Sequence, residues 1–512
     1  MSSSLLTFSV GPVHEFIGQA RRVADLWAGS QILSELTRGA IGSLLEDPSC
    51  SLIFPAVKQN DIPAGLPNRF VARVPSDRAG DTAKRLAAVV ASRWQTFVEH
   101  AGVELARLQF DCSGLIDENS LWRQAIQCSW SWTEETGTYE HDSRAAAELY
   151  AASRVFRPFD ASNERGIKCA ICGERNALPG SDRNDVIRDA WQRAEEIAEG
   201  QGLKPFVRRD QSRLCAVCAA RRFYPTLEKA RDRRAIFDSF ESFQPDDERS
   251  YFALVTMDGD RLGEALGNST ENEQAEISRI LSRFANDLRT GENAELNLTK
   301  LGIASPSSRT PPQLIYAGGE DVLFISDPRD AIECAVAIRK HFCQQFQRAG
   351  RELTISAAVV FAHTKIPAGR LLRIADDLLK RRAKATWNAI AVALHKRSGP
   401  AVETVFPWEG DVPIGTLQAI AKELEDRHLA SRQTYDLRDE SRVLTGLFSD
   451  GEWQAWLRWR LSRGERSHGQ EQRLADLLAP LFTGSPQRIG ALRIARFLAV
   501  EVAARKTNGA AP

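Results

Sequence analysis

The sequence has no excess of either charge. Its 512 residues contain 67 Lys and Arg and 67 Asp and Glu. The chain therefore lacks the overall positive field of a dedicated nucleic-acid binder, and any contact with nucleic acid has to be local or shared with partner subunits. A hydrophobic fraction of 43% and a charged fraction of 26% are typical of a folded globular protein rather than a disordered one.

Targeting and membrane signals are missing as well. The N-terminus, MSSSLLTFSV, has neither the basic start nor the long apolar core of a signal peptide. No run approaches the roughly 18 apolar residues of a membrane span. The nine cysteines are an odd number and favour a reducing compartment and metal binding over disulfides. We therefore expect a cytoplasmic protein with no membrane partner.

Two common catalytic patterns are also absent. The sequence has no Walker A phosphate-binding loop and no evident Ser-His-Asp arrangement. The dipeptide His141–Asp142 lacks the further histidine ligands that a metal-dependent phosphohydrolase needs, so we interpret it as a surface pair.

What the sequence does contain is a repeated order of strands and helices. Residues 1–110 are predicted to form strand, helix, strand, strand and helix, beginning with LLTFSV, and residues 246–400 repeat this order from YFALVTMDGD. When LTFSVGPVHEFIG is laid on ALVTMDGDRLGEA, Gly11 falls where the second copy has Asp258. We therefore expect an α+β protein with two ferredoxin-like βαββαβ units, of which the first has lost its acids.

Two more segments complete the expected organisation. Residues 111–245 are predicted to be helical, rich in arginine and the carrier of four paired cysteines, and residues 401–512 are predicted to be a helical C-terminal domain. The four expected domains are 1–110, 111–245, 246–400 and 401–512.

Acidic residues follow two strands of the second unit. TMDGDRLG places Asp258 and Asp260 at the end of an apolar strand, and YAGGEDV places Glu320 and Asp321 at a tight turn that the glycine pair permits. In a ferredoxin-like sheet the first strand lies beside this hairpin, so the carboxylates converge. A hard divalent cation such as Mg²⁺ relieves their repulsion, and two such ions activate a hydroxyl and stabilise a leaving pyrophosphate. The alternative is an ordinary turn and hairpin with solvated acids.

A lysine and four cysteines add two further candidate sites. Lys384, in LLRIADDLLKRRAK, could meet a triphosphate, or it could simply favour a helix C-terminus. The two CxxC pairs suit a structural tetrahedral zinc, because four thiolates leave no open position for catalysis, and the alternative is four reduced structural thiols. These cysteines are Cys169, Cys172, Cys215 and Cys218.

Arginines are concentrated around the cysteine pairs. They either contact RNA phosphates or form a solvated or subunit-facing surface. The residues are Arg208, Arg209, Arg213, Arg221, Arg222, Arg231, Arg233 and Arg234.

Several motifs, taken in order, resemble one known family. They are FSVGPVHEFIGQARRVADLWAGSQILS, GLPNRFVA, CAIC and LCAVC, TMDGDRLG, YAGGEDVLFI and LTISAAVVFAHTKIPAGRLLRIADDLLKRRAK. Together they closely resemble the large polymerase/cyclase subunit of type III CRISPR effector complexes, in its Cmr (III-B) branch, over about residues 5–400. The resemblance implies two palm domains related to GGDEF-type cyclases, with only the second catalytic. It also implies a zinc-binding helical insertion between them and an all-α C-terminal domain.

The resemblance also implies roles for individual residues. Asp258, Glu320 and Asp321 are expected to be catalytic and to bind Mg²⁺ or Mn²⁺, with ATP as the substrate. The residues expected to contact the nucleotide are Gly259, Asp260, Gly318, Gly319 and Lys384. The family's motif is GGDD, and here Glu320 takes the third position. GGDEF cyclases accept either acid there, so we expect activity to be retained.

The function that the resemblance implies is RNA-triggered signalling. The family joins ATP molecules into cyclic oligoadenylates when its complex of protein subunits and guide RNA pairs with target RNA. One alternative product couples ATP to S-adenosylmethionine, and another interpretation is a catalytically silent scaffold, made plausible by Glu320. A stand-alone GGDEF-like cyclase is disfavoured by the two-palm layout and the zinc region. Many relatives begin with an HD nuclease domain, whereas this sequence opens on the first palm, so we expect no DNA cleavage.

Overall fold

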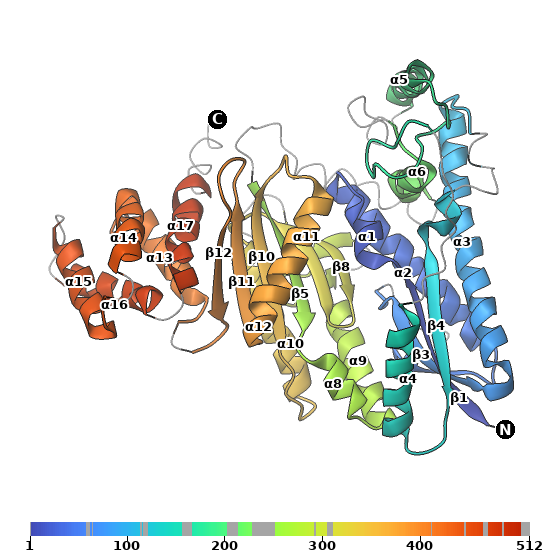
Figure 1. The fold of residues 1–512 in the computed structure, drawn as a ribbon, viewed down its shortest axis with the longest axis horizontal. Helices are drawn as coiled ribbons and strands as arrows, with labels where there is room; N and C mark the ends of the chain where they lie inside the picture. The colour runs from blue at the N-terminus through green and yellow to red at the C-terminus, as the bar shows by residue number, and fades with distance from the viewer. Residues whose placement is uncertain are drawn as a thin grey trace.

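The computed structural model of the chain has an α+β fold. Figure 1 shows two sheets side by side, with helices α13–α17 beyond one of them. The structure describes residues 2–57, 62–63, 65–112, 115, 121–155, 166–201, 213–227, 251–290, 293–304, 311–410, 412–444, 447–463, 469–483 and 486–502.

The first sheet has four strands in the order β2-β3-β1-β4, and all its neighbours are antiparallel. The strands are β1 (Ser3–Gly11), β2 (Ser51–Phe54), β3 (Arg69–Pro75) and β4 (Gln127–Glu134). The apolar strand β1 is buried on both faces. Its Leu6, Phe8 and Val10 pack against helices α2 (Val23–Leu45) and α3 (Ala79–Arg107), whereas Leu5 packs against Ala146 of α4 (Tyr139–Ser153).

Strand β4 lies beyond residue 110, where we expected the first unit to end and a helical domain to begin. Its sequence, QCSWSWTE, alternates larger and smaller side chains as a half-buried strand does. Trp130 stacks on Phe8 of β1, with ring centroids 6.1 Å apart. This packing attaches residues 127–134 to the first sheet.

The second sheet has eight strands in the order β12-β11-β10-β5-β9-β8-β7-β6. Its central four, β10-β5-β9-β8, repeat the order β4-β1-β3-β2 of the first sheet. Only β10 and β11 pair in parallel. The strands are β5 (Tyr251–Gly259), β6 (Arg289–Thr290), β7 (Asn293–Leu296), β8 (Gln313–Gly318), β9 (Asp321–Ser326), β10 (Ile355–His363), β11 (Ala389–His395) and β12 (Val402–Pro407).

Helices cover both faces of the second sheet. α9 (Glu271–Asp287) and α10 (Ala331–Gln347) pack on one face, and α11 (Ala368–Leu378) packs on the other. The core under α11 is continuous with the core of the first unit. Helix α1 (Val13–Gly18) crosses α11 so closely that a Cβ on Gly369 would lie 2.0 Å from the carbonyl oxygen of Gly18. The two units are therefore in direct contact at this crossing.

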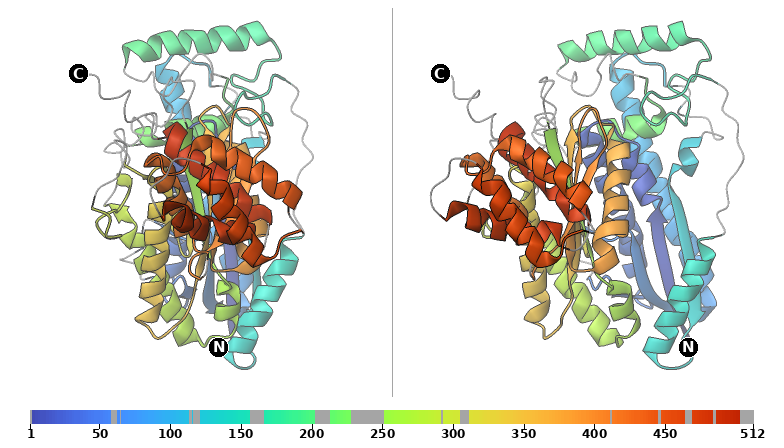
Figure 2. Two further views of the ribbon diagram at one scale, coloured as in Figure 1. Left: turned by 90° about the vertical axis from the view of Figure 1, so that its left-hand side faces the viewer. Right: turned by 60° about the vertical axis from the view of Figure 1, so that its left-hand side comes forward.

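The C-terminal part is helical apart from its first strand. β12 lies past residue 400, where we expected the helical domain to start, and it completes the edge of the second sheet. The helices that follow are α13 (Gly415–Glu425), α14 (Ser431–Leu444), α15 (Asp450–Ser462), α16 (Gln470–Phe482) and α17 (Gly490–Arg496). Figure 2 shows them as one group set apart from the first unit. In the described ranges no helix is long and apolar enough to cross a membrane.

Two of the clustered arginines are interior residues. Arg221 and Arg222, on α6 (Ala216–Phe223), are each 1% exposed. Arg222 donates two hydrogen bonds to the Asp25 carboxylate, at 2.7 and 2.9 Å, and Arg221 donates one to the carbonyl oxygen of Phe16 at 2.6 Å. The expectation of an RNA-contacting or solvated surface is therefore wrong for these two.

The other arginines of that set are not buried in this way. Arg213 is exposed and donates to Asn184 at 2.9 Å. Arg208, Arg209, Arg231, Arg233 and Arg234 lie outside the described residues.

The buried pair of Asp25 and Arg222 fixes α6 to α2. Burial opposes ionisation of Asp25, but the charges of Arg222, Arg22 and Arg221 hold its pKa below the ordinary value. Asp25→Asn should lower the free energy of unfolding by about 3–5 kcal/mol at pH 7, because Arg222 then loses its buried counter-ion. In the wild type the pair should stabilise the fold above about pH 4 and lose this contribution as the pH falls through the folded-state pKa.

Urea denaturation of both variants measures this effect. Asp185→Asn is the matched control, because Asp185 forms an ion pair with Arg183 in which the side chains are 49% and 68% exposed. Such an exposed pair contributes little. If Asp25→Asn and Asp185→Asn lowered the free energy of unfolding equally, the stabilising role of the buried pair would be contradicted.

Candidate functional site

Strand register brings two of the expected carboxylates together. Met257 of β5 pairs with Val322 of β9, so Asp258 and Asp321 emerge at the same end of adjacent strands. The β8–β9 hairpin closes there through Gly319 and Glu320, and the positive φ of Gly319, +63°, is a conformation that glycine adopts without strain.

A cavity of about 210 Å³ lies between the two units at this point. Asp258, Asp321 and Lys380 line it from the second unit. His14, Ser34 and Asn68 line it from the first. Apolar side chains such as Leu33 and Leu372 complete the wall. The cavity thus combines acidic and basic groups with an apolar surface, as small-molecule sites do.

Lys384 reaches the same place. Its Nζ donates to Oδ2 of Asp258 at 2.6 Å and to the carbonyl oxygen of Gly259 at 3.0 Å. The side chain is only 16% exposed. The structure therefore places Lys384 beside the carboxylates, as expected of a residue of this site.

Lys380 is a second lysine of the site, which sequence reasoning missed. It lies in the π-helical segment η7 (Leu379–Ala383) that continues α11, and its Nζ donates to Asp376 at 2.9 Å. Lys380 and Lys384 are four residues apart along this segment, and π-helical turns often occur at functional sites. The available signal was this four-residue spacing.

Glu320 takes a different position from the two aspartates. It does not line the cavity, and its side chain lies over Gly259, where an added Cβ would be 2.9 Å from the Cβ of Glu320. Loss of hydration, and then the charge of Asp258, raises the pKa of Glu320 to about 7. The pKa of Asp321 is raised well above its usual range by loss of hydration and by the charges of Glu320 and Asp258.

The carboxylates are close without forming a compact ligand set. Among the described residues, the cysteine cluster is the one group of three or more potential ligands whose atoms all lie within 4.8 Å of one another. Asp258 and Asp321 therefore line one cavity together with Asp376 of α11, and Glu320 lies on their flank.

Asp260 faces the protein interior. Its carboxylate accepts hydrogen bonds from Thr354 Oγ1 at 2.6 Å, Ser356 Oγ at 2.7 Å and the Asn388 N–H at 2.9 Å. These bonds tie the end of β5 to β10 and to the start of β11. Here Asp260 supports the fold around the site, and the expected contact with a nucleotide stays a prediction.

The four paired cysteines converge at a second position. Cys169 and Cys172 lie on a turn, Cys215 precedes α6 and Cys218 lies on it. The Sγ atoms of Cys172 and Cys215 are 3.8 Å apart. Arg221 donates to Sγ of Cys218 at 3.1 Å, as a cation beside a thiolate would. This donor set could hold a metal ion.

The His141–Asp142 pair belongs to neither site. His141 is exposed, and the buried Asp142 accepts hydrogen bonds from the N–H groups of Thr136 and Gly137 ahead of α4. The interpretation as a surface pair therefore holds for His141 and is wrong for Asp142, whose carboxylate holds the turn before the helix.

Two family models match the chain. Residues 251–391 match Cas10/Cmr2, second palm domain, and residues 5–99 match CRISPR-associated protein Cmr2, N-terminal. The two sheets with their helices, and the match of residues 251–391, define an α+β protein with a palm domain.

A curated relative and several solved structures are similar to it. The CRISPR system Cmr subunit Cmr2 of Pyrococcus furiosus is 23% identical over 79% of this chain, which spans 63% of that protein's length. Type III-B Cmr-beta in its apo state has a TM-score of 0.62 at 12% identity, covering 91% of this chain and 78% of the other. Cmr-beta bound to cognate target RNA has a TM-score of 0.60 at 11% identity, covering 96% and 83%.

A Csm1-Csm4 cassette in complex with one ATP has a TM-score of 0.50 at 11% identity, covering 98% of this chain and 70% of the other. At such identities the solved structures bear on the fold alone. The two family models and the Pyrococcus relative agree that residues 5–99 and 251–391 are similar to the N-terminal and second palm domains of Cas10/Cmr2 proteins.

The contact between Gly259 and Glu320 makes a prediction about the hairpin. Gly259→Ala should lower the free energy of unfolding by about 1–3 kcal/mol, because the new methyl group displaces the Glu320 side chain and the turn that carries it. Gly263→Ala is the matched control, because a Cβ there meets nothing within 4 Å and lies in helix α8 (Leu262–Gly267), where alanine is favoured. Urea denaturation should separate the two variants, and a neutral Gly259→Ala would contradict the close packing.

Proposed function

We propose that this chain is the nucleotidyltransferase subunit of a type III CRISPR effector complex. On binding of target RNA to the guide RNA, it joins ATP molecules 3′ to 5′ into a cyclic oligoadenylate. The observation that carries the proposal is the single cavity in which Asp258 and Asp321 face Lys380, with Lys384 held against Asp258. Carboxylates can hold the ion of a metal-bound triphosphate, and lysines can meet its phosphates.

The donor chemistry of the site fits Mg²⁺ or Mn²⁺. Asp258 and Asp321 would hold the ion, and Glu320 would join them from the flank. Loss of hydration and the charges of neighbouring carboxylates raise the pKa values of Glu320 and Asp321, and a hard cation would relieve the repulsion between these charges. When bound, the metal lowers the pKa of the attacking ribose hydroxyl and stabilises the leaving pyrophosphate.

The chain's own residues bind and orient the nucleotide. Lys384 and Lys380 contact the phosphates. Their positive charges offset the repulsion between the negative phosphates and the carboxylates. The apolar wall of Leu33 and Leu372 takes the base and excludes water from that side. We expect Gly318 and Gly319 to contact the nucleotide through their backbone atoms, because both lie at the turn of the β8–β9 hairpin.

The comparisons support this proposal in two respects. A structure of similar fold is described as a complex with one ATP, and another is described as bound to cognate target RNA. We extend the nucleotide and the RNA to this chain as its substrate and its partner, together with other protein subunits of such a complex.

The shared strand order supports an extended proposal about the domains. Both units are ferredoxin-like palms of the GGDEF type, and the first is inactive because Gly11 stands at the end of β1 where β5 has Asp258. The helical segment between the palms is a zinc-binding insertion, and the C-terminal helices form a separate domain.

The assembled complex with labelled ATP, Mg²⁺ and target RNA tests the enzyme. Asp321→Ala should reduce product formation by about 100-fold or more, because a metal ligand is lost. Asp426→Ala removes a surface carboxylate that pairs with Lys422 on α13 and should leave the rate unchanged. No product from the intact complex, or an undiminished yield from Asp321→Ala, would favour a silent scaffold. Product that appears only with added S-adenosylmethionine would identify the alternative acceptor.

We also propose that the four cysteines hold a structural Zn²⁺. A tetrahedral site with Zn–S bonds near 2.3 Å has sulfur–sulfur separations of about 3.8 Å. The separation of Cys172 and Cys215 equals this value. Three of the four side chains are buried, so the ion would be closed off from substrate. Its role would be to fasten the turn of Cys169 and Cys172 to α6.

Metal analysis of the purified chain tests the zinc proposal. We expect one zinc per chain, near-complete loss of it in Cys172→Ser, and a lower Tm for that variant, because the turn is no longer tied to α6. Cys343→Ser is the control, since Cys343 lies outside the cluster and donates only to the carbonyl oxygen of Leu353 at 3.7 Å. Full zinc retention in Cys172→Ser would contradict the site.

A further inference from the structure

Strand β4 is the outer strand of the first sheet. Among the residues that the structure describes, its backbone pairs with β1 and with no other strand. One row of N–H and C=O groups therefore faces away from the sheet. Such a row is a template for pairing with another extended chain.

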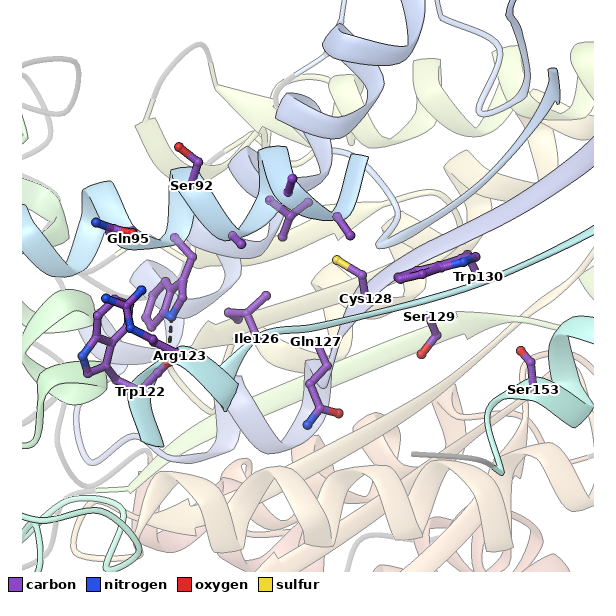
Figure 3. A pocket seen from close by; sticks show the side chains of 15 residues that line it. Ser92, Gln95, Trp122, Arg123, Ile126, Gln127, Cys128, Ser129, Trp130 and Ser153 are labelled. Carbon is purple, nitrogen blue, oxygen red and sulfur yellow. Dashed lines mark hydrogen bonds between the residues drawn. The ribbon is translucent and has the colours of Figure 1, made fainter. Parts of the chain in front are cut away.

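A groove of about 680 Å³ runs beside this edge, between β4 and α3 (Figure 3). Cys128 and Trp130 point from β4 toward the helix, whereas Gln127 and Ser129 point to the other side. The wall formed by α3 consists largely of small side chains that allow a close approach. Its residues are Ala87, Ala88, Val90, Ala91, Ser92, Trp94 and Gln95.

The second sheet carries a strand at the corresponding position. β10 occupies in its unit the place of β4, and its outer side pairs in parallel with β11, for example Ala357 with Ile390. Ile390, Val392 and Leu394 of β11 are buried in the core that contains α10. The equivalent space in the first unit, beside α3, is the groove.

The charge at the groove favours a protein occupant. Arg123 lies at the end where β4 begins, and its guanidinium stacks on the Trp122 ring at 4.5 Å. No ion pair of Arg123 occurs among the described residues. It is the one charged side chain in the lining, too little positive charge for a strand of phosphates but suited to one carboxylate.

We propose that β4 is the docking strand for an extended segment of a partner protein. This segment adds to the first sheet as a fifth strand, parallel to β4, as β11 does beside β10. Its apolar side chains enter the groove against α3, and an acidic residue near its N-terminus pairs with Arg123. The proposal is independent of the catalytic one, because the groove shares no residue with the cavity of Asp258 and Asp321.

A peptide that copies β11 and its flanking residues is the probe. It spans residues 388–396, NAIAVALHK, with Glu in place of Asn388 and a fluorescent label at its C-terminus. The full chain should bind it, as followed by anisotropy. Hydrogen exchange should show new protection of alternate amides in 127–134, which is the signature of strand addition rather than of contact with the groove alone.

Two tryptophan variants on the same helix provide the control. Ala91→Trp fills the groove and should weaken binding by about tenfold or more. Thr96→Trp, also on the exposed surface of α3 but outside the lining, should leave it unchanged. Both sites are exposed, so folding should be preserved. Arg123→Ala should weaken binding of the peptide that carries Glu more than binding of a peptide that keeps Asn at the position of Asn388.

Three results would overturn the proposal. The first is equal binding by Ala91→Trp and the wild type, or no binding at all. The second is full protection of the β4 amides in the chain alone at every concentration, which would mean that a segment of the same chain covers the edge. The third is protection that rises with protein concentration together with a doubled mass by light scattering, which would identify a second copy as the occupant.

Discussion

The close crossing of helices α1 and α11 is the constraint on which the rest of the site depends. Gly369 lies against the carbonyl oxygen of Gly18 with no room for a Cβ, so the two units approach to backbone contact. Only at this separation do His14 and Asn68 of the first unit enclose the cavity that Asp258 and Asp321 open from the second. The first unit, which has Gly11 at the end of β1, therefore forms a wall of the cavity.

Charge balance is the second requirement of this cavity. Neighbouring carboxylates raise one another's pKa, and in the protein alone Lys384 offsets part of this repulsion by bonding Asp258. A lysine in this position serves two states. It offsets the negative charge of the carboxylates in the protein alone, and under the proposed function its charge would be available to phosphate once a metal ion was held by the carboxylates. Lys380, in the π-helical segment before Lys384, is a second cation of the cavity, and its own partner is Asp376.

The sequence was sufficient to predict the repeated unit, the convergence of Asp258 with Asp321, and the approach of all four cysteines, because each follows from strand periodicity or from short motif spacing. It was not sufficient for Asp260, whose carboxylate turns to Thr354 and Ser356, since the partners come from a strand about ninety residues away. It also failed for Arg221 and Arg222. An arginine-rich segment suggests a surface, and only the long-range partner Asp25 reveals that these side chains are interior. The position of β4 was missed because half-buried strands resemble irregular segments.

The two units show how one strand order supports two different roles. In the second unit the edge beyond β10 is covered by β11 and β12, and Asp260 fastens that extension to the end of β5 through Asn388. The covering strands thus hold in place the chain segments that lie beside Asp258 and Asp321.

The first unit has no carboxylate at the corresponding end of β1, and its sheet, over the described residues, stops at β4. Unpaired edge backbone beside an apolar groove is a template on which another strand can pair. The strand order that the two units share is therefore compatible with an extended edge in one unit and an open edge in the other.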